Sequence, residues 1–162
     1  MTDAIAPEVK GKTIDIGCGA TLIRCCPGFD VYTDIVEPDL GLPGKYVRCA
    51  MESMPFADKE FEYARCYHAI EHCEDPDAAC SEILRIASSG TISFPPAQAE
   101  LMFGRREHRW FVFIDFPNDP KLCRLLFVRK QNPSYNIKSH VSGCQKSVNF
   151  HWEGSFDWRV IQ

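Results

Sequence analysis

The sequence predicts an α/β protein built on an open, mostly parallel sheet that ends in an antiparallel hairpin. Short expected strands alternate with helical or loop connections over the first 95 residues or so, and a glycine cluster follows the first of them, which is β-branched. Two segments with alternating apolar and polar residues, joined by a turn sequence, close the chain. With 162 residues, 45% of them hydrophobic, we expect one domain over 1–162 with a proper core.

Five strands are expected in the first part of the chain, at 12–16, 29–33, 46–49, 61–66 and 91–94. A helix precedes the last of them: Asp75 is suited to cap it and Pro76 to occupy its first position. Three apolar residues then fall at helical spacing, namely Ala79, Ile83 and Ile86. We expect this helix to end at Gly90.

The C-terminal region has a different pattern. Apolar residues alternate with polar ones on both sides of Glu153-Gly154-Ser155, which predicts a hairpin over 148–161. The aromatic residues at its inward positions are expected in the core or at a dimer contact; they are Trp152, Phe156 and Trp158. A further helix is expected from Asp119-Pro120 to about Lys130.

The cysteine content argues for a reducing compartment. Nine cysteines cannot all pair within one chain, and no C-x-x-C pair occurs. Most are expected to be small buried residues, with Cys25-Cys26 as the pair exposed to oxidation. The chain has no apolar run near the ~20 residues of a membrane span and no secretory start. We therefore expect a cytoplasmic protein with no membrane partner.

Charge is distributed unevenly along the chain. Residues 1–100 carry a net charge of −9 and residues 101–162 a net charge of +5. This pattern fits two solvated faces of one domain, or an acidic half for a cationic ligand and a basic half for an anionic one. With a pI near 5.7, the chain lacks the strong positive charge of a nucleic-acid binder, so we do not expect nucleic acid as a partner. A short sheet with an open edge favours a homodimer.

A candidate ligand site follows the first expected strand, which ends in D-I-G-C-G. Glycines at such a turn let backbone N–H groups approach a ligand at the carboxyl ends of the strands. Asp34, at the end of the second strand, is well placed to accept hydrogen bonds from ribose hydroxyls. The third glycine of the dinucleotide fingerprint is missing, which disfavours an NAD enzyme.

Five linked motifs carry a family resemblance: T-I-D-I-G-C-G (13–19), V-Y-T-D-I (31–35), E-S-M-P-F-A-D-K-E-F-E (52–62), H-A-I-E-H-C-E-D-P (68–76) and E-I-L-R-I-A-S-S-G (82–90). In this order, residues 13–95 resemble the class I S-adenosylmethionine-dependent methyltransferases, within their small-molecule methyltransferase-domain group. The resemblance implies a Rossmann-like, doubly wound sheet and an enzyme that transfers a methyl group from S-adenosylmethionine to a small-molecule acceptor. By topology, the closing hairpin is similar to the antiparallel pair that ends this fold.

The resemblance also implies roles for individual residues. The methionine and ribose part of the cofactor would lie against Asp15, Gly17, Cys18 and Gly19. Asp34 would hold the ribose hydroxyls, with Ile35 directly after it. Residues 50–52, which include Met51 and Glu52, would lie beside adenine. The end of the fourth strand would border the sulfonium and the acceptor through Cys66, Tyr67 and His68.

Departures from the family pattern leave a second interpretation open. About nine residues separate Gly19 from the second strand, too few for the usual first helix, and Ala50 stands where an aspartate commonly lies near adenine. The chain is also short, with A-S-S-G before the fifth strand in place of the usual turn. The alternative is a degenerate, non-catalytic protein of the same fold that serves as an accessory or interaction subunit.

Candidate acceptor residues follow the fifth strand in R-R-E-H-R-W (105–110). His108 is the first candidate for a catalytic base and His68 the second. The arginines are suited to a phosphate or carboxylate, so a small anionic acceptor is expected. The competing interpretation is a surface loop anchored by Trp110, Phe111 and Phe113.

H-A-I-E-H (68–72) also fits a pattern found in zinc peptidases. That interpretation needs a long helix and a third ligand downstream, such as Glu153. Asp75-Pro76 begins a new segment almost at once, so the methyltransferase interpretation is favoured and we expect no metal.

Overall fold

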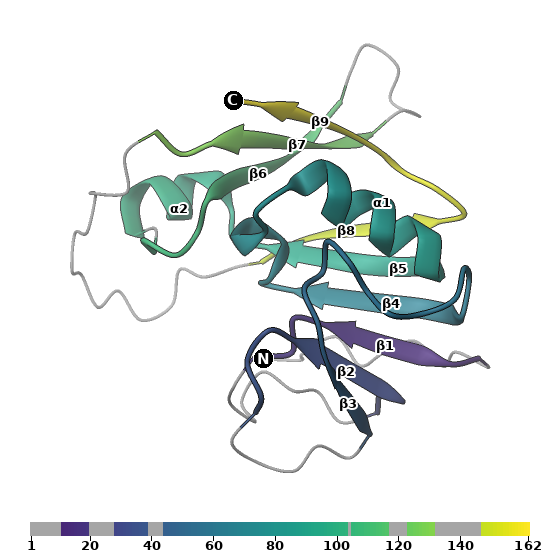
Figure 1. Ribbon diagram of the computed structural model, residues 1–162. Helices are drawn as coiled ribbons and strands as arrows, with labels where there is room; N and C mark the ends of the chain where they lie inside the picture. The colour runs from purple at the N-terminus through teal and green to yellow at the C-terminus, as the bar shows by residue number, and fades with distance from the viewer. Residues whose placement is uncertain (1–10, 20–27, 39–43, 104, 117–122, 132–146) are drawn as a thin grey trace.

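The computed structural model describes residues 11–19, 28–38, 44–103, 105–116, 123–131 and 147–162. They form a six-stranded and a three-stranded sheet with two helices and one turn of 3-10 helix (Figure 1). The strands of the larger sheet are β1 (Thr13–Ile16), β2 (Val31–Asp34), β3 (Lys45–Arg48), β4 (Phe61–Tyr67), β5 (Ala87–Phe94) and β8 (Val148–Glu153). The remaining elements are η1 (Ile70–His72), α1 (Pro76–Ile86), α2 (Ala97–Phe103), β6 (Trp110–Asp115), β7 (Arg124–Arg129) and β9 (Asp157–Ile161).

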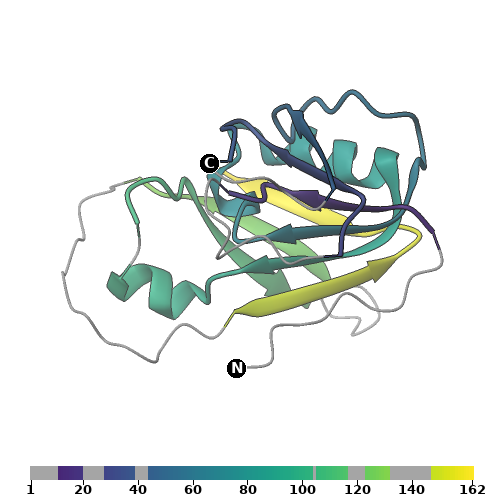
Figure 2. The same ribbon diagram turned by 90° about the horizontal axis from the view of Figure 1, so that it is seen from below.

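The larger sheet has the strand order β3-β2-β1-β4-β5-β8. The first five strands run parallel, and β8 runs antiparallel to β5 at the edge (Figure 2). The chain moves outward from β1 to β3, returns to the other side of β1 with β4, and continues to β5. This is the mostly parallel, Rossmann-like α/β arrangement that the sequence predicts. Its order reverses between β1 and β4, where the carboxyl ends of the strands form the crevice that binds ligands in such folds.

Helix α1 begins as predicted. Asp75 accepts hydrogen bonds from the backbone N–H groups of Asp77 and Ala78 at 2.9 and 3.3 Å, and Pro76 is the first helical residue. The predicted end is wrong, because the helix stops at Ile86 and β5 begins directly at Ala87. Gly90 lies inside β5, where an added Cβ would come within 2.3 Å of the Ala64 carbonyl oxygen. It permits a close approach of two strands and does not terminate a helix.

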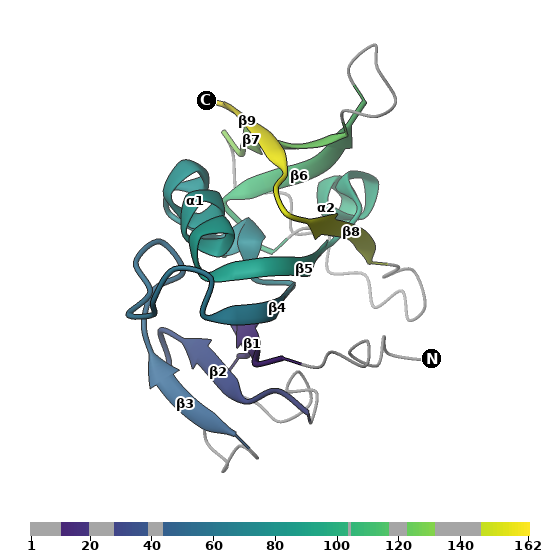
Figure 3. The same cartoon turned by 90° about the vertical axis from the view of Figure 1, so that its right-hand side faces the viewer.

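The predicted C-terminal hairpin is also corrected. Both segments are strands, but β8 pairs antiparallel with β5 in the larger sheet, and β9 pairs parallel with β7 in the smaller one (Figure 3). Between them, only an isolated bridge from Glu153 to Ser155 is recorded for this part of the described chain. Alternation along a strand shows that one face is buried, but it does not identify the neighbouring strand.

The predicted helix over 119–130 is wrong from residue 124 onward, and Asp119-Pro120 lies outside the described residues. Arg124–Arg129 is strand β7, which pairs with β6 and buries Leu125 and Phe127 at alternate positions. Strand β6 shows that the anchored-loop interpretation was partly right: Trp110 is 2% exposed and donates its Nε1–H to the Cys73 carbonyl at 2.8 Å. The three-stranded sheet, which has the order β6-β7-β9, was not predicted.

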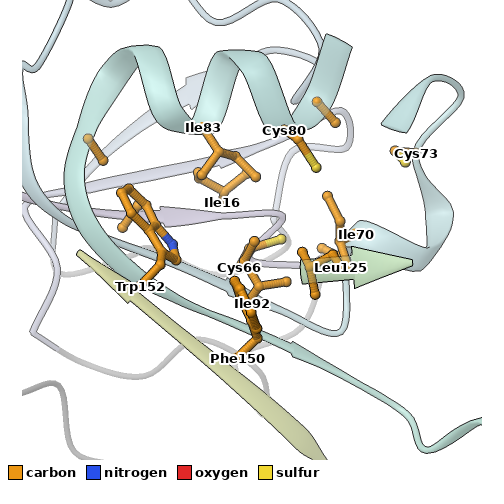
Figure 4. Packing of buried hydrophobic residues seen from close by; sticks show 14 of the residues in the cluster. Ile16, Cys66, Ile70, Cys73, Cys80, Ile83, Ile92, Leu125, Phe150 and Trp152 are labelled. Carbon is orange, nitrogen blue, oxygen red and sulfur yellow. The ribbon is translucent and has the colours of Figure 1, made fainter. Parts of the chain in front are cut away.

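The hydrophobic core lies between one face of the larger sheet and a layer made of α1 and the smaller sheet (Figures 3 and 4). Strand registers align two rows on this face, Ile14–Ala64–Gly90–Trp152 and Ile16–Cys66–Ile92–Phe150. Ile83 of α1 and Leu125 of β7 pack against these rows. Trp152 and Phe156 are buried in this cluster and Trp158 packs against it, so their predicted place in the core is confirmed.

The described cysteines agree with the expectation of buried thiols. Four of them are buried, namely Cys18, Cys66, Cys73 and Cys80, while Cys49 is half-buried and Cys123 is exposed. Burial raises the pKa of the Cys66, Cys73 and Cys80 thiols. Cys25-Cys26 and the short connection after Gly19 lie outside the described residues. Within the described part of the chain, no helix is long and apolar enough to cross a membrane.

Candidate active site

A cavity of about 350 Å³ opens at the carboxyl ends of β1, β2 and β4. Its wall combines four segments: the glycine turn after β1, the end of β2, the loop after β3 and the residues after β4. Six of the predicted cofactor residues line it: Gly17, Gly19, Asp34, Ile35, Met51 and Glu52. This position is the crevice that the strand order predicts.

The turn after β1 holds the glycines close to the opposite wall. Gly17 has φ +70°, and a Cβ there would come within 2.3 Å of the Ala69 Cβ, so no larger residue fits. The N–H groups of Gly17 and Cys18 both donate to the Thr33 carbonyl, at 2.8 and 2.9 Å. These bonds fix the glycine turn against the end of β2.

Asp34 connects this turn to the end of β2. Its Oδ2 accepts the Gly19 N–H at 2.7 Å and its Oδ1 accepts the Val36 N–H at 3.1 Å. Each carboxylate oxygen has a second lone pair. The carboxylate is thus oriented by the backbone and retains acceptor capacity at the cavity wall, as a ribose diol requires.

The loop after β3 forms another side of the cavity with Ala50, Met51 and Glu52. Glu52 reaches across to accept the Glu74 N–H at 2.7 Å, which connects this loop to the segment after β4. Further along the loop, the Met54 N–H donates to Glu82 of α1 at 2.8 Å. Glu82 is held in turn by Arg85 at 2.7 Å. The pKa of Glu82 is lowered by the Arg85 hydrogen bond, which outweighs burial.

His68 directly follows β4 and lines the cavity. Its φ of +51° is uncommon for a residue other than glycine, and such strain concentrates at functional sites. Its Nε2 is 2.7 Å from the Ser147 hydroxyl. Its Nδ1 is 3.4 Å from Glu71 Oε1.

Four predicted cofactor residues lie outside the cavity wall. Asp15 is 1% exposed, and its side chain lies on the face of the sheet that points away from α1. There Arg65 donates to both carboxylate oxygens of Asp15, at 2.9 and 2.7 Å. Burial raises the pKa of Asp15, and Arg65 only partly offsets it. Cys18 is buried beside Phe29 and Tyr32, Cys66 is part of the core, and Tyr67 places its hydroxyl 3.3 Å from Ser147.

His108, the first candidate for a base, does not line the cavity. It is 8% exposed, and its Nδ1 is 2.8 Å from the Glu100 carboxylate. Its ring packs edge-on against His72, with centroids 4.5 Å apart, and His72 does line the cavity. His72 is a cavity residue that the sequence did not predict, although it lies in H-A-I-E-H, because both interpretations of that motif, as a family motif and as a zinc-peptidase pattern, left it outside the cofactor and acceptor residues.

Of the neighbouring arginines, Arg109 lines the cavity, where it pairs with Glu74. Arg105 and Arg106 are exposed and lie outside the wall. Of the arginines predicted to suit an anion, Arg109 is therefore the one that lies at the cavity.

Comparison with known proteins identifies the class of the chain. Residues 14–94 match the model of the methyltransferase domain family, so the chain belongs to that family. The fold around the cavity is the one that the sequence resemblance implies, and the resemblance is confirmed. No curated protein sequence matches the chain.

Three solved structures are similar to parts of the chain. The YcgJ protein of Bacillus subtilis is 20% identical, with a TM-score of 0.45, over 53% of this chain and 44% of its own. A methyltransferase of Thermotoga maritima, described as a possible histamine N-methyltransferase, is 19% identical, with a TM-score of 0.41, over 57% and 47%. An S-adenosylmethionine-dependent methyltransferase of Mesorhizobium loti is 19% identical, with a TM-score of 0.45, over 72% and 61%. The aligned region is thus less than two thirds of each of these proteins, and the family assignment rests on the matched segment alone.

Proposed function

We propose that the protein binds S-adenosylmethionine in this cavity and transfers its methyl group to a small anionic acceptor. The observation that carries the proposal is the arrangement of Gly17, Gly19 and Asp34 around one cavity at the strand-order reversal. The residues present fit this cofactor, because the glycine turn leaves room for close approach and Asp34 retains acceptor capacity beside it.

When bound, the cofactor supplies an electrophilic methyl group on a sulfonium ion. The chain's own residues position the two reactants: Asp34 would hold the ribose, and Met51 would contribute an apolar wall toward the adenine. Because methyl transfer needs the acceptor lone pair in line with the methyl carbon, such positioning and the exclusion of water provide much of the rate.

The acceptor would enter beside His68 and Arg109, which line the cavity with residues 72–74. Arg109 supplies the positive charge for an anionic group, in competition with Glu74. His68 would take the acceptor proton where one must leave, through Nε2, which now contacts Ser147. In this proposal His68 is the base. His108 supports the cavity wall from behind through its ring contact with His72.

The test is calorimetric titration of the reduced protein with S-adenosylhomocysteine, beside Asp34→Asn. The substitution keeps the side-chain size and one acceptor oxygen, so the glycine turn is largely retained. We expect micromolar binding at one site per chain, weakened in the variant by about 1–3 kcal/mol, the cost of an unpaired polar group. That corresponds to roughly 5- to 150-fold in the dissociation constant.

Asp157→Asn is the matched control, because Asp157 is an exposed aspartate on β9, away from the cavity wall. It should bind like the wild type. Equal affinities for wild type and Asp34→Asn would remove Asp34 from the site. No binding up to millimolar ligand would contradict the proposal and favour the accessory, non-catalytic alternative.

A further inference from the structure

Glu71 has an unusual environment for a carboxylate. Its side chain is fully buried, and neither Oε1 nor Oε2 has a hydrogen-bond partner in the described structure. Leaving a buried acceptor unpaired is costly, and the cost is larger for a charged group. A buried carboxylate of this kind calls for a cation close to its oxygens.

Histidine side chains surround this carboxylate. His108 places its Nε2 3.9 Å from Glu71 Oε1, and His68 places its Nδ1 3.4 Å from the same oxygen. Glu71, His72 and His108 each offer a ligand atom, and these three atoms all lie within 4.8 Å of one another. Nearby, the Arg109 N–H donates to the Glu71 carbonyl at 2.8 Å, which holds the segment before β6 against η1.

The orientation of two of these rings is set from behind. His108 Nδ1 faces the Glu100 carboxylate at 2.8 Å, and Glu100 is itself paired with Lys130. His72 Nδ1 lies 3.1 Å from the Glu107 carbonyl, which accepts its proton in the matching tautomer. Both rings would therefore offer Nε2 to an ion beside Glu71. Metal-binding histidines usually have their second nitrogen held in this way by a carboxylate or a backbone carbonyl.

We propose that Glu71, His72 and His108 bind a divalent transition-metal ion of the Zn²⁺ type. Two imidazoles and one carboxylate form a donor set of zinc sites that retain an open position, whereas Mg²⁺ and Ca²⁺ prefer oxygen ligands. Ligands at about 2.0–2.2 Å from a tetrahedral ion lie roughly 3.4 Å apart. The separation of 3.9 Å between His108 and Glu71 needs only a small closure.

This site differs from the zinc interpretation that the sequence alone suggested. There the two histidines of H-A-I-E-H and a downstream residue such as Glu153 would bind the metal. In the structure Glu153 lies at the end of β8, opposite Ser89. The third ligand is instead His108, and the motif contributes its glutamate with its second histidine.

The ion would lie at the wall of the cavity, because His72 lines it beside His68. An open coordination position there would take an oxygen or nitrogen atom of a small ligand and lower the pKa of a bound hydroxyl. This last role rests on the proposed methyl transfer. Metal binding by the three side chains does not.

The experiment is a Co²⁺ titration of the reduced, metal-free protein followed by visible absorption. We expect one Co²⁺ per chain with the d–d bands of a nitrogen- and oxygen-ligated ion. Binding should be lost or weakened by more than tenfold in Glu71→Gln, His72→Gln and His108→Gln. Glu100→Gln changes a residue that contacts His108, but neither Glu71 nor His72 in any recorded bond, and it should weaken binding by about 10–100-fold. His151→Gln is the control, since this exposed histidine lies on β8 and bonds Thr91.

Circular dichroism of each metal-free variant checks the fold. The substitutions affect η1, α2 and the segment before β6, so a variant that fails to fold leaves others to test the proposal. Glu71→Gln should fold at least as well as the wild type, because the amide removes a buried charge. Three results would overturn the proposal: no stoichiometric Co²⁺, equal binding by wild type and Glu71→Gln, or intense thiolate-to-cobalt bands from the cysteines. A titration of the metal-free protein with S-adenosylhomocysteine tests the proposed function separately. Cofactor binding without Co²⁺ binding would overturn the metal site alone, and Co²⁺ binding without cofactor binding would overturn the proposed function alone.

Discussion

The two faces of the six-stranded sheet are built from opposite chemistry. On the face toward α1, the rows are formed by apolar residues such as Ile16, Ile92 and Phe150. On the other face, the register aligns Asp15–Arg65–Thr91–His151, and Ser93 donates to Asn149 in the next row. Parallel strands covered on both faces usually read as continuous apolar runs.

The contrast shows that the two faces stabilise the sheet by different means. Dispersion and apolar burial hold the α1 face, where loss of volume leaves a cavity. The other face depends on satisfied polar contacts: Asp15 with Arg65, Tyr63 with Thr91, and Thr91 with His151. A buried ion pair such as Asp15 with Arg65 costs stability when one member is removed, and it contributes less than that cost when both members are present.

The largest loss of stability is predicted for a substitution on the polar face of the sheet. Arg65→Met leaves Asp15 buried without its partner and should destabilise the fold by about 3–5 kcal/mol. Adding Asp15→Asn removes the orphaned charge and should restore most of the loss, which chemical denaturation measures. A loss below about 1 kcal/mol in the single variant would show that the pair is not a stabilising unit.

A sharper comparison uses two neighbours in β5 that point to opposite faces. Ile92→Ala removes volume from the core and should cost about 2–5 kcal/mol. Ser93→Ala removes one hydrogen bond, to Asn149, and should cost about 0.5–1.5 kcal/mol. Both residues are almost fully buried, so the chemistry of the face accounts for the difference. Equal losses in denaturation midpoints would contradict the contrast.

A smaller, pH-dependent effect concerns the contact between α1 and the cavity loop. Glu82→Gln should cost about 1–2 kcal/mol near neutral pH, because it weakens bonds to Arg85 and the Met54 N–H. The pKa of Glu82 is lowered from its ordinary 4.5 when folded. Its stabilisation is therefore present above about pH 4.5 and is lost as pH falls through the lower folded pKa. Denaturation at neutral and acidic pH should show the cost of the variant shrinking with acid; a constant cost would contradict this account.

The sequence predicted most of the parallel sheet and the start of α1, because local signals suffice there. Short segments rich in β-branched or aromatic residues mark strands β1 to β5, and Asp75-Pro76 marks the start of α1. Strands at β8 and β9 were also predicted, but their pairing was not, because their partners lie far away in the sequence. The prediction failed for β7, where Asp119-Pro120 indicated the start of a helix running to about Lys130.

The same distinction applies to the site. The sequence predicted three residues that line the cavity, because each lies at or directly after the end of an expected strand: Gly17, Gly19 and Asp34. The cluster of Glu71, His72 and His108 could not be found in this way. Its last member reaches the others through the packing of β6 against η1, which no local pattern encodes.

The most direct test of the cofactor cavity is hydrogen–deuterium exchange of the protein with and without S-adenosylhomocysteine. We expect slower exchange in 16–19, 33–36 and 49–52, the segments that supply most of the cavity wall, and unchanged exchange in β8 (148–153) at the far edge of the larger sheet. Protection absent from the glycine turn, or confined to the polar face, would contradict the placement of the cofactor.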